Sequence, residues 1–174
     1  MKPSIRAKNP SDNGDIHQLT REAFSQMARS SHTEQFIVDA LREANALTVS
    51  LVAELSLAAS DSKIIAHVAV SAVTVSDGSK SWYGLGPISV HPDHQGQGVG
   101  SGLMKHALRD LAQLGAAGCV LLGDPAFYSR FGFEPIEVLT LAGVSTENFQ
   151  ALLLNSERFP QGQVSYHTAF SATE

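Results

Sequence analysis

A glycine-rich turn between an extended segment and an amphipathic helix constrains the fold of this chain more than any other feature. The turn runs from Gln95 to Gly102. From Val99, apolar residues recur at helical spacing, at positions 103, 104, 107, 108, 111 and 114. Alternating glycines let the backbone turn sharply and direct successive N–H groups into one space, to which the helix adds its own unpaired N–H groups. The turn is therefore predicted to bind an anion such as a pyrophosphate.

Two familiar phosphate-binding turns do not fit this segment. A Walker loop ends in Gly-Lys-Ser or Gly-Lys-Thr, and the sequence has neither triplet. A dinucleotide-binding Gly-x-Gly-x-x-Gly turn would need a glycine where Ser101 stands. It would also need an acidic residue about 20 positions beyond Gly98, where Gly118 stands; the first acid after the next strand is Asp124. The turn is left as a phosphate site of another kind, or as a turn that merely packs tightly.

The rest of the sequence predicts a mixed α/β fold. At about 100–200 residues per domain, the 174 residues correspond to a single domain, 1–174. Periodicity and β-branched content predict these elements in chain order: a strand at 3–9, helices through 16–24 and 36–41, a hairpin of strands 47–58 and 64–75, a strand at 81–90, a helix at 99–114, a strand at 119–122, a short helix after Pro125 and a last strand at 163–170. Residues 149–154 fit helix or strand equally well. Glycine and proline inside 81–90 predict a bulge or a splayed edge.

Composition excludes several classes of protein. The 12 Lys and Arg against 17 Asp and Glu leave a net charge of −5, which argues against a sequence-independent grip on nucleic acid. One cysteine excludes an internal disulfide framework and a thiolate zinc cluster. No apolar stretch reaches about 18 residues, and the N-terminus has no apolar signal-peptide region. We therefore expect a soluble, cytoplasmic protein that does not contact a membrane.

Three motifs in register resemble one family over essentially the whole chain. Gln95–Gly100 looks like the Gln/Arg-x-x-Gly-x-Gly/Ala motif of the GNAT superfamily of N-acetyltransferases. The preceding Trp82–Val90 resembles the splayed fourth strand of that family, and Gly123–Phe133 resembles its Tyr-x-x-x-Gly-Phe ending. Together with 164–170, the set looks most like the YhbS-type members. One departure is Gly123-Asp124-Pro125, where many members have an asparagine that bonds the pantetheine; YhbS-type members share this variation.

The resemblance implies a GNAT fold, in which helices flank a splayed mixed sheet, and it implies acetyl-CoA as co-substrate. The pyrophosphate is expected on the turn and the helix start, formed by Gln95, Gly96, Gln97, Gly98, Val99, Gly100 and Ser101. The backbone of Ile88, Ser89 and Val90 is expected to pair with the pantetheine arm as an added strand. The implied reaction is transfer of the acetyl group to a primary amine of a small molecule or protein, by direct attack in a ternary complex.

The resemblance also suggests which groups move protons. The matching tyrosine of family members lies near the coenzyme sulfur, so Tyr128 is the candidate acid for the departing thiolate. Glu54 and, less strongly, His67 are candidates for the base that deprotonates the amine, since both lie on strands near the acceptor side. Either side chain could equally point to solvent, because neighbouring residues of a strand face opposite sides. Direct release of the amine proton to solvent is the third possibility.

The remaining features leave alternatives open. A non-catalytic acetyl-CoA sensor is the rival from a different functional class; it would keep the turn but need no acid. His91 and His94 lie three apart in a turn, which is weak as a metal site, so no metal is expected. Cys119 begins an apolar strand and is expected in the core. A homodimer contact and ordinary core explain equally well the apolar residues Phe149, Leu152, Leu153, Leu154 and Phe159.

Overall fold

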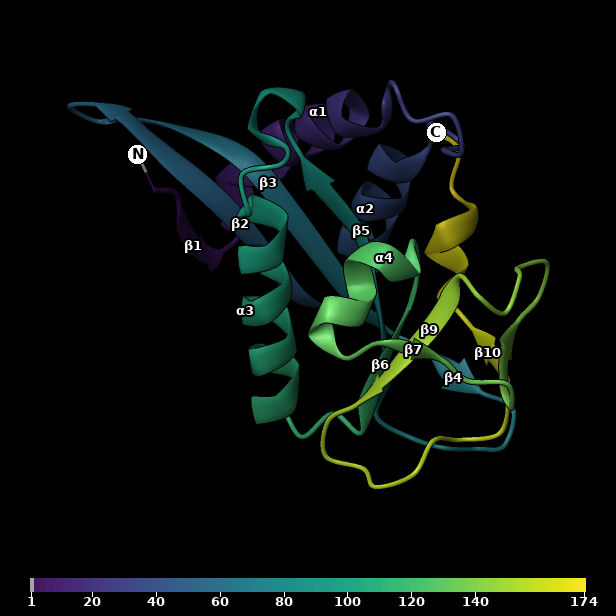
Figure 1. Ribbon diagram of the computed structural model, residues 1–174. Coiled ribbons are helices and arrows are strands. Elements are labelled where there is room, and N and C mark those ends of the chain that lie inside the picture. Colours follow the sequence, from purple (N-terminus) through teal and green to yellow (C-terminus); the bar gives the residue numbers. More distant parts are fainter. Residues whose placement is uncertain (1) are drawn as a thin grey trace.

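The computed structural model describes residues 2–174 and contains a mixed β-sheet with helices on both faces (Figure 1). Its strands are β1 (Ser4–Ala7), β2 (Leu47–Ala58), β3 (Asp61–Ala72), β4 (Thr74–Val75), β5 (Trp82–Val90), β6 (Gly118–Leu122), β7 (Glu134–Pro135), β8 (Leu139–Leu141), β9 (Phe149–Leu153) and β10 (Gly162–Ser165). Its α-helices are α1 (Asn13–Phe24), α2 (Glu34–Glu43), α3 (Val99–Gln113) and α4 (Pro125–Tyr128). Short 3₁₀ turns lie at Pro10–Asp12, Pro92–His94, Ser129–Phe131 and Thr168–Ser171.

The main sheet is interrupted near its middle. Its order is β1-β2-β3-β5-β6-β9-β7, and every neighbouring pair is antiparallel except β5 and β6. These two parallel strands pair only from Trp82 opposite Gly118 to Gly84 opposite Val120. Beyond Gly84, β5 continues to Val90, and none of the strands within residues 2–174 pairs with it on that edge, so the sheet opens between β5 and β6. A second, three-stranded sheet has the order β4-β10-β8.

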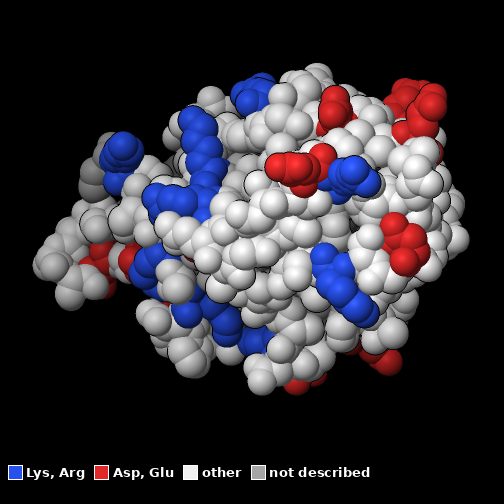
Figure 2. Space-filling view, turned by 90° about the horizontal axis from the view of Figure 1, so that it is seen from below, with Lys and Arg blue, Asp and Glu red and all other residues white. Residues whose placement is uncertain are grey.

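Charged side chains are sparse on the face seen from below. Figure 2 shows that most of this face carries neither acidic nor basic residues; Lys and Arg gather mainly toward one side, and Asp and Glu mainly toward the other. The net charge of −5 is therefore a poor guide to the charge at any one site on this face. Within residues 2–174, no helix combines the length and apolar character that a membrane span requires.

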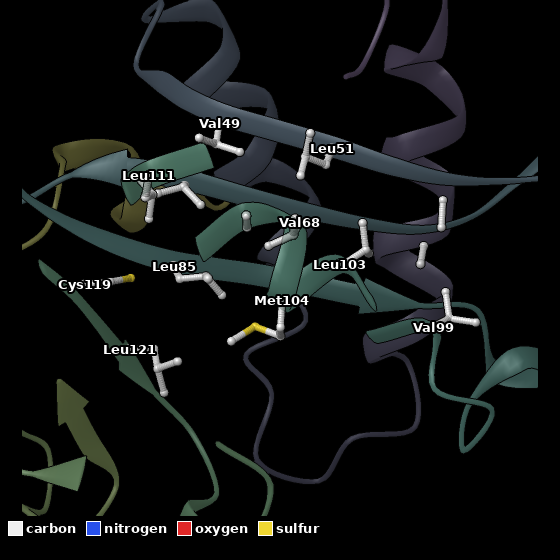
Figure 3. Packing of buried hydrophobic residues seen from close by; sticks show 14 of the residues in the cluster. Val49, Leu51, Val68, Leu85, Val99, Leu103, Met104, Leu111, Cys119 and Leu121 are labelled. Atoms are coloured by element: carbon white, nitrogen blue, oxygen red, sulfur yellow. The ribbon is translucent and has the colours of Figure 1, made fainter. Parts of the chain in front are cut away.

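Two apolar layers hold the sheet between its helices. On one face, Leu103, Met104 and Leu111 of α3 are fully buried against strands that carry Val68 and Leu85 (Figure 3). On the other face, the buried cluster joins α1 and α2 to β2 and β3 through Ile16, Leu19, Val38, Val52 and Ile64. The helical spacing that predicted α3 thus corresponds to a stripe that faces the sheet. Strand β5 lies between both layers, so its open edge has a rigid support.

The three longer helices and the strands predicted at 47–58, 81–90 and 119–122 are confirmed, and three other predicted strands need correction. Residues 149–153 form a strand, β9, which settles the ambiguity there. The strand predicted at 64–75 is two strands in different sheets, because β3 ends at Ala72 and β4 pairs with β10. The strand predicted at 163–170 ends at Ser165, after which His167 Nδ1 accepts from the N–H of Ala169 and begins a 3₁₀ turn. The first strand spans 4–7 rather than 3–9.

Candidate active site

The open edge of β5 forms one wall of the candidate site. Opposite β3, the register shifts so that Gly86 and Pro87 face the single residue Ala69, which is the bulge predicted from the sequence. After the bulge, Ile88, Ser89 and Val90 pair with β3 on one edge only. An antiparallel strand directs part of its N–H and C=O groups to each edge, so this segment can accept an extended ligand as an added strand.

The glycine-rich turn continues directly from that edge. Gly96 and Gly98 have φ values of +73° and +82°, the left-handed region that glycine tolerates best. The turn is held from within, because Gln95 Nε2 donates to the Val90 carbonyl at 3.0 Å and Gln97 Nε2 donates to the Asp93 carbonyl at 3.1 Å. The glutamine side chains therefore stabilise the turn. The Gln95 N–H, which the sequence predicts to bind the pyrophosphate, instead donates to the Pro92 carbonyl at 3.4 Å, so the N–H groups from Gly96 onward are the candidates for an anion.

The start of α3 completes an anion-binding geometry. Its N-cap is Gly98, which has no side chain to cap the first N–H groups, and its first turn has no acidic residue. A Cβ at Gly96 or Gly98 would meet no atom within 4 Å, so the space in front of the turn is open. Free N–H groups and the positive end of the helix dipole favour a phosphate at this position. The residues present therefore fit the pyrophosphate of a coenzyme.

Tyr128 is the last residue of α4, the short helix that follows β6, and β6 is the strand next to β5 across the opening. Asp124 caps this short helix by accepting from the Ala126 N–H at 2.9 Å, and Pro125 occupies its first position. The half-buried Tyr128 ring packs edge-on against Phe127, with centroids 4.8 Å apart. Burial raises the pKa of the phenol, so it is protonated near neutral pH and able to donate.

Glu54 does not have the geometry of a free base. Its two carboxylate oxygens accept from Arg6 Nε at 3.0 Å and Arg6 Nη2 at 3.2 Å, and Ser62 Oγ donates at 2.6 Å. The Arg6 hydrogen bond is the main cause that lowers the pKa of Glu54, and Asp12 binds the same guanidinium. Glu54 also lies on β2, two strands away from the open edge of β5. This geometry argues against the predicted role and favours a structural ion pair.

His67 lies on β3, the strand that pairs with β5, and its side chain is fully buried. It lies directly opposite Ser89, its Nε2 is 2.8 Å from Ser50 Oγ, and its Nδ1 has no hydrogen-bond partner within the described chain. Desolvation lowers the pKa of His67 to about 3, so the ring is neutral at physiological pH. The structure thus places His67 next to β5, as the base role requires, but buries its side chain away from solvent.

The remaining candidates occupy ordinary positions. The His91 and His94 rings pack edge-on with centroids 5.7 Å apart, and His91 Nε2 lies 3.4 Å from Glu22 Oε2 on α1. Residues 2–174 contain no cluster of three or more His, Cys, Asp or Glu side chains suited to a metal ion. Cys119 is fully buried, and burial raises the pKa of its thiol. Sequence reasoning missed Gln150, which contacts the peptide beneath Tyr128, because nothing in its local pattern marked it.

The fold and this site together define an α/β protein that has an anion-binding turn beside an opening in its sheet. An acetyltransferase (GNAT) domain matches residues 51–135. Over 130 residues, the chain is 38% identical to the N-acetyltransferase YhbS of Escherichia coli K12, covering 75% of this chain and 72% of that protein. This chain belongs to the GNAT family of acetyl-CoA-dependent N-acetyltransferases, which confirms the predicted family, fold and enzyme class.

Two solved structures agree over nearly the full chain. A GNAT family acetyltransferase from Brucella melitensis, in complex with acetyl-CoA, is 44% identical, covers 97% of each chain and gives a TM-score of 0.83. The Escherichia coli YhbS structure, in complex with CoA, is 33% identical, covers 100% of this chain and 94% of that one, and gives a TM-score of 0.87. These findings support an acetyltransferase rather than a non-catalytic sensor.

Proposed function

We propose that the chain binds acetyl-CoA along the open edge of β5 and transfers the acetyl group to a primary amine. The observation that carries this proposal is the continuity of the open edge with the turn. An unpaired strand edge at Ile88–Val90 runs directly into main-chain N–H groups that no side chain caps. The pantetheine arm is assigned to Ile88, Ser89 and Val90, and the pyrophosphate to the N–H groups of Gly96, Gln97, Gly98, Val99 and Gly100 with Ser101 at the helix start. Gln95 holds this turn through its side chain and its own N–H. The coenzymes bound to the two relatives support this assignment.

Transfer requires a neutral amine, a polarised thioester carbonyl and a proton for the thiolate. The main-chain N–H of Val90 polarises the carbonyl, as a preorganised donor does in acyl transfer. The amine attacks directly in a ternary complex: the C–N bond forms as the C–S bond breaks, and the electron pair leaves with sulfur. Tyr128 gives its phenolic proton to that sulfur, the attacking nitrogen loses one proton to solvent, and the Tyr128 phenolate takes a proton from solvent before the next turnover.

The two proton transfers have very different costs. An alkylamine with a pKa of ~10.4 must lose its proton at pH 7, which costs roughly 4.6 kcal/mol. A phenol with a pKa of ~10 that protonates a thiolate with a pKa of ~8.5 works uphill by roughly 2 kcal/mol. The raised pKa of the buried Tyr128 phenol increases that cost, so proton transfer must accompany C–S cleavage.

For the amine proton, we assign direct release to solvent. Both oxygens of Glu54 are engaged by Arg6, and His67 is buried and neutral. Direct release is therefore the remaining route of the three that the sequence leaves open. It predicts that the rate rises with pH as the free amine population rises, without the inflection that a protein base near pH 6–7 would add.

The proposal also covers the class of acceptor, the oligomeric state and the location of the protein. The acceptor is an amine of a small molecule or protein. We assign its binding site to the loop at 25–33, between α1 and α2, and the loop at 142–148, between β8 and β9. Residues 1–174 act as one GNAT domain, and a homodimer through the C-terminal apolar segment is the candidate assembly. We also assign the protein to the cytoplasm, the location expected from its sequence.

Calorimetric titration with acetyl-CoA, and with CoA and NAD as comparisons, tests the binding site. We expect micromolar binding of acetyl-CoA and no heat from NAD; absence of binding to all three would refute the assignment of the turn.

Tyr128→Phe tests the proposed role of the phenol as the acid. We expect kcat to fall at least tenfold while affinity for acetyl-CoA is kept, and an unchanged kcat would leave Tyr128 as a packing residue.

A further inference from the structure

Gly123 forms the surface on which the Tyr128 ring rests. It follows Leu122, whose pairing with Phe149 is the last of the β6–β9 ladder. A Cβ built on Gly123 would lie 2.3 Å from Cε2 and 3.3 Å from Cζ of Tyr128. The ring therefore occupies the space that a side chain at position 123 would fill. The position of the phenol at the opening depends on where this one peptide lies.

Both main-chain groups of Gly123 are held from the β9 side. Its N–H donates to the carbonyl of Asn148 at 2.9 Å. Its carbonyl accepts from Gln150 Nε2 at 3.1 Å. The ladder has ended at Leu122, so the Gln150 side chain supplies a bond where the main chain of a longer strand would have done so.

Filling core space does not by itself explain a glutamine at this position. Gln150 is 1% exposed, and its Oε1 has no hydrogen-bond partner within residues 2–174. A buried amide oxygen without a partner is unfavourable, whereas leucine would fill a similar space without that cost but would leave the Gly123 carbonyl without its side-chain donor. The side-chain bond that Gln150 makes is the one to Gly123. Its value therefore lies in fixing that peptide.

The geometry points to Gln150 as a positioning residue for the acid: it fixes the Gly123 peptide, and through it the Tyr128 phenol, toward the coenzyme sulfur. This inference rests on the proposed role of Tyr128. The role of Gln150 is carried by the hydrogen bond to Gly123 and not by a contact with substrate. When the Gln150 contact is lost, the phenol moves away from the sulfur although the phenol itself is unchanged.

The thiol of bound CoA reports on this contact without any acceptor. A phenol that donates to sulfur stabilises the thiolate, so it lowers the pKa of the bound thiol. The thiolate of CoA is titrated by its ultraviolet absorbance in complexes with the wild type, Tyr128→Phe, Gln150→Leu and the double variant, and the desulfo-CoA complexes are subtracted to remove tyrosine absorbance. We expect the thiol pKa to rise by about one unit in Tyr128→Phe. Gln150→Leu raises it too, and the double variant equals Tyr128→Phe.

Controls separate positioning from general damage. Asn155→Leu removes another side-chain amide that donates to main-chain carbonyls, those of Ala112 and Ala116 at 3.0 and 2.8 Å, and should leave the thiol pKa unchanged. Thermal denaturation verifies that each variant is folded. If Gln150→Leu does not fold, Gln150→Met keeps the side-chain length while removing the donor, and the same criteria apply.

The outcomes distinguish this inference from the proposed function. A Gln150 variant with the wild-type thiol pKa overturns the inference while the Tyr128→Phe shift stands. A Gln150 effect that persists in the Tyr128→Phe background also overturns it, because the glutamine would then act without the phenol. If Tyr128→Phe itself leaves the thiol pKa unchanged, the proposed role of Tyr128 fails, and the positioning role fails with it.

Discussion

Replacing Gly123 by alanine should separate coenzyme binding from catalysis. The new Cβ would lie 2.3 Å from Tyr128 Cε2, and ordinary contact begins at 3.4 Å, so the ring has to shift by 3.4 − 2.3 = 1.1 Å. Displacements of about 1 Å can reduce catalysis by about 10²-fold. We therefore expect kcat to fall by about 10²-fold. Affinity for acetyl-CoA should stay close to wild type, because the turn at Gln95–Gly100 is untouched.

The assay follows thiol release from acetyl-CoA with an amine acceptor found by screening, alongside calorimetric binding of acetyl-CoA. Gly14→Ala is the matched control, since a Cβ at Gly14 on α1 meets no atom within 4 Å. Overpacking at Gly123 costs about 1–3 kcal/mol, and each kcal/mol lowers Tm by about 2–4 °C in a domain of this size. A folded Gly123→Ala protein with wild-type kcat would refute the reasoning that Gly123 sets the position of Tyr128.

Three further predictions address the turn and the two residues considered as bases. Gly98→Ala imposes a side chain at φ +82°, which costs about 1–2 kcal/mol, so the Tm should fall by about 2–8 °C and acetyl-CoA affinity should fall about tenfold by calorimetry. Arg6 lowers the pKa of Glu54, so this contribution to stability is complete above the ordinary value of 4.5 and is lost as pH falls; Glu54→Gln should flatten the acid limb of Tm against pH yet leave the pH profile of kcat unchanged. Burial lowers the pKa of His67 from 6.5 to about 3, so denaturant titrations should show stability falling below pH 6.5 by up to about 1.4 kcal/mol per unit, and less steeply in His67→Leu.

Local pattern was sufficient wherever one segment determines its own structure. The glycines at 96 and 98 announce a turn because few other residues adopt their φ values, and the apolar spacing after Val99 specifies which face of α3 is buried. Gly86 and Pro87 likewise mark the bulge, since both weaken a regular strand. These three features place the open edge and the turn next to each other, which is most of the coenzyme site.

Pattern was insufficient wherever a side chain depends on a distant partner. Glu54 stands on the predicted strand, but Arg6, 48 positions away in sequence, determines the direction and ionisation of its carboxylate. Strand alternation does not tell which face of the sheet the His67 side chain lies on. That side chain is buried because α1 and α2 pack on its face of the sheet. Gln150 lies in a segment that fits helix or strand, so its contact with Gly123 appears only once β9 is placed beside β6.

The split between β5 and β6 also determines how substitutions can change the width of the opening in the sheet. Within residues 2–174, three residue pairs of the ladder join the two blocks of the sheet, β1-β2-β3-β5 and β6-β9-β7, next to one main-chain bond from the Ala117 N–H to the Ser81 carbonyl. Beyond those pairs, the width of the opening depends on side-chain packing around residues such as Leu103 and Leu121 rather than on the fixed spacing of a ladder. Substitutions at such positions can widen or narrow the opening while every strand keeps its register. Tolerance for longer acyl groups can thus change by small steps in core volume, independently of the fold.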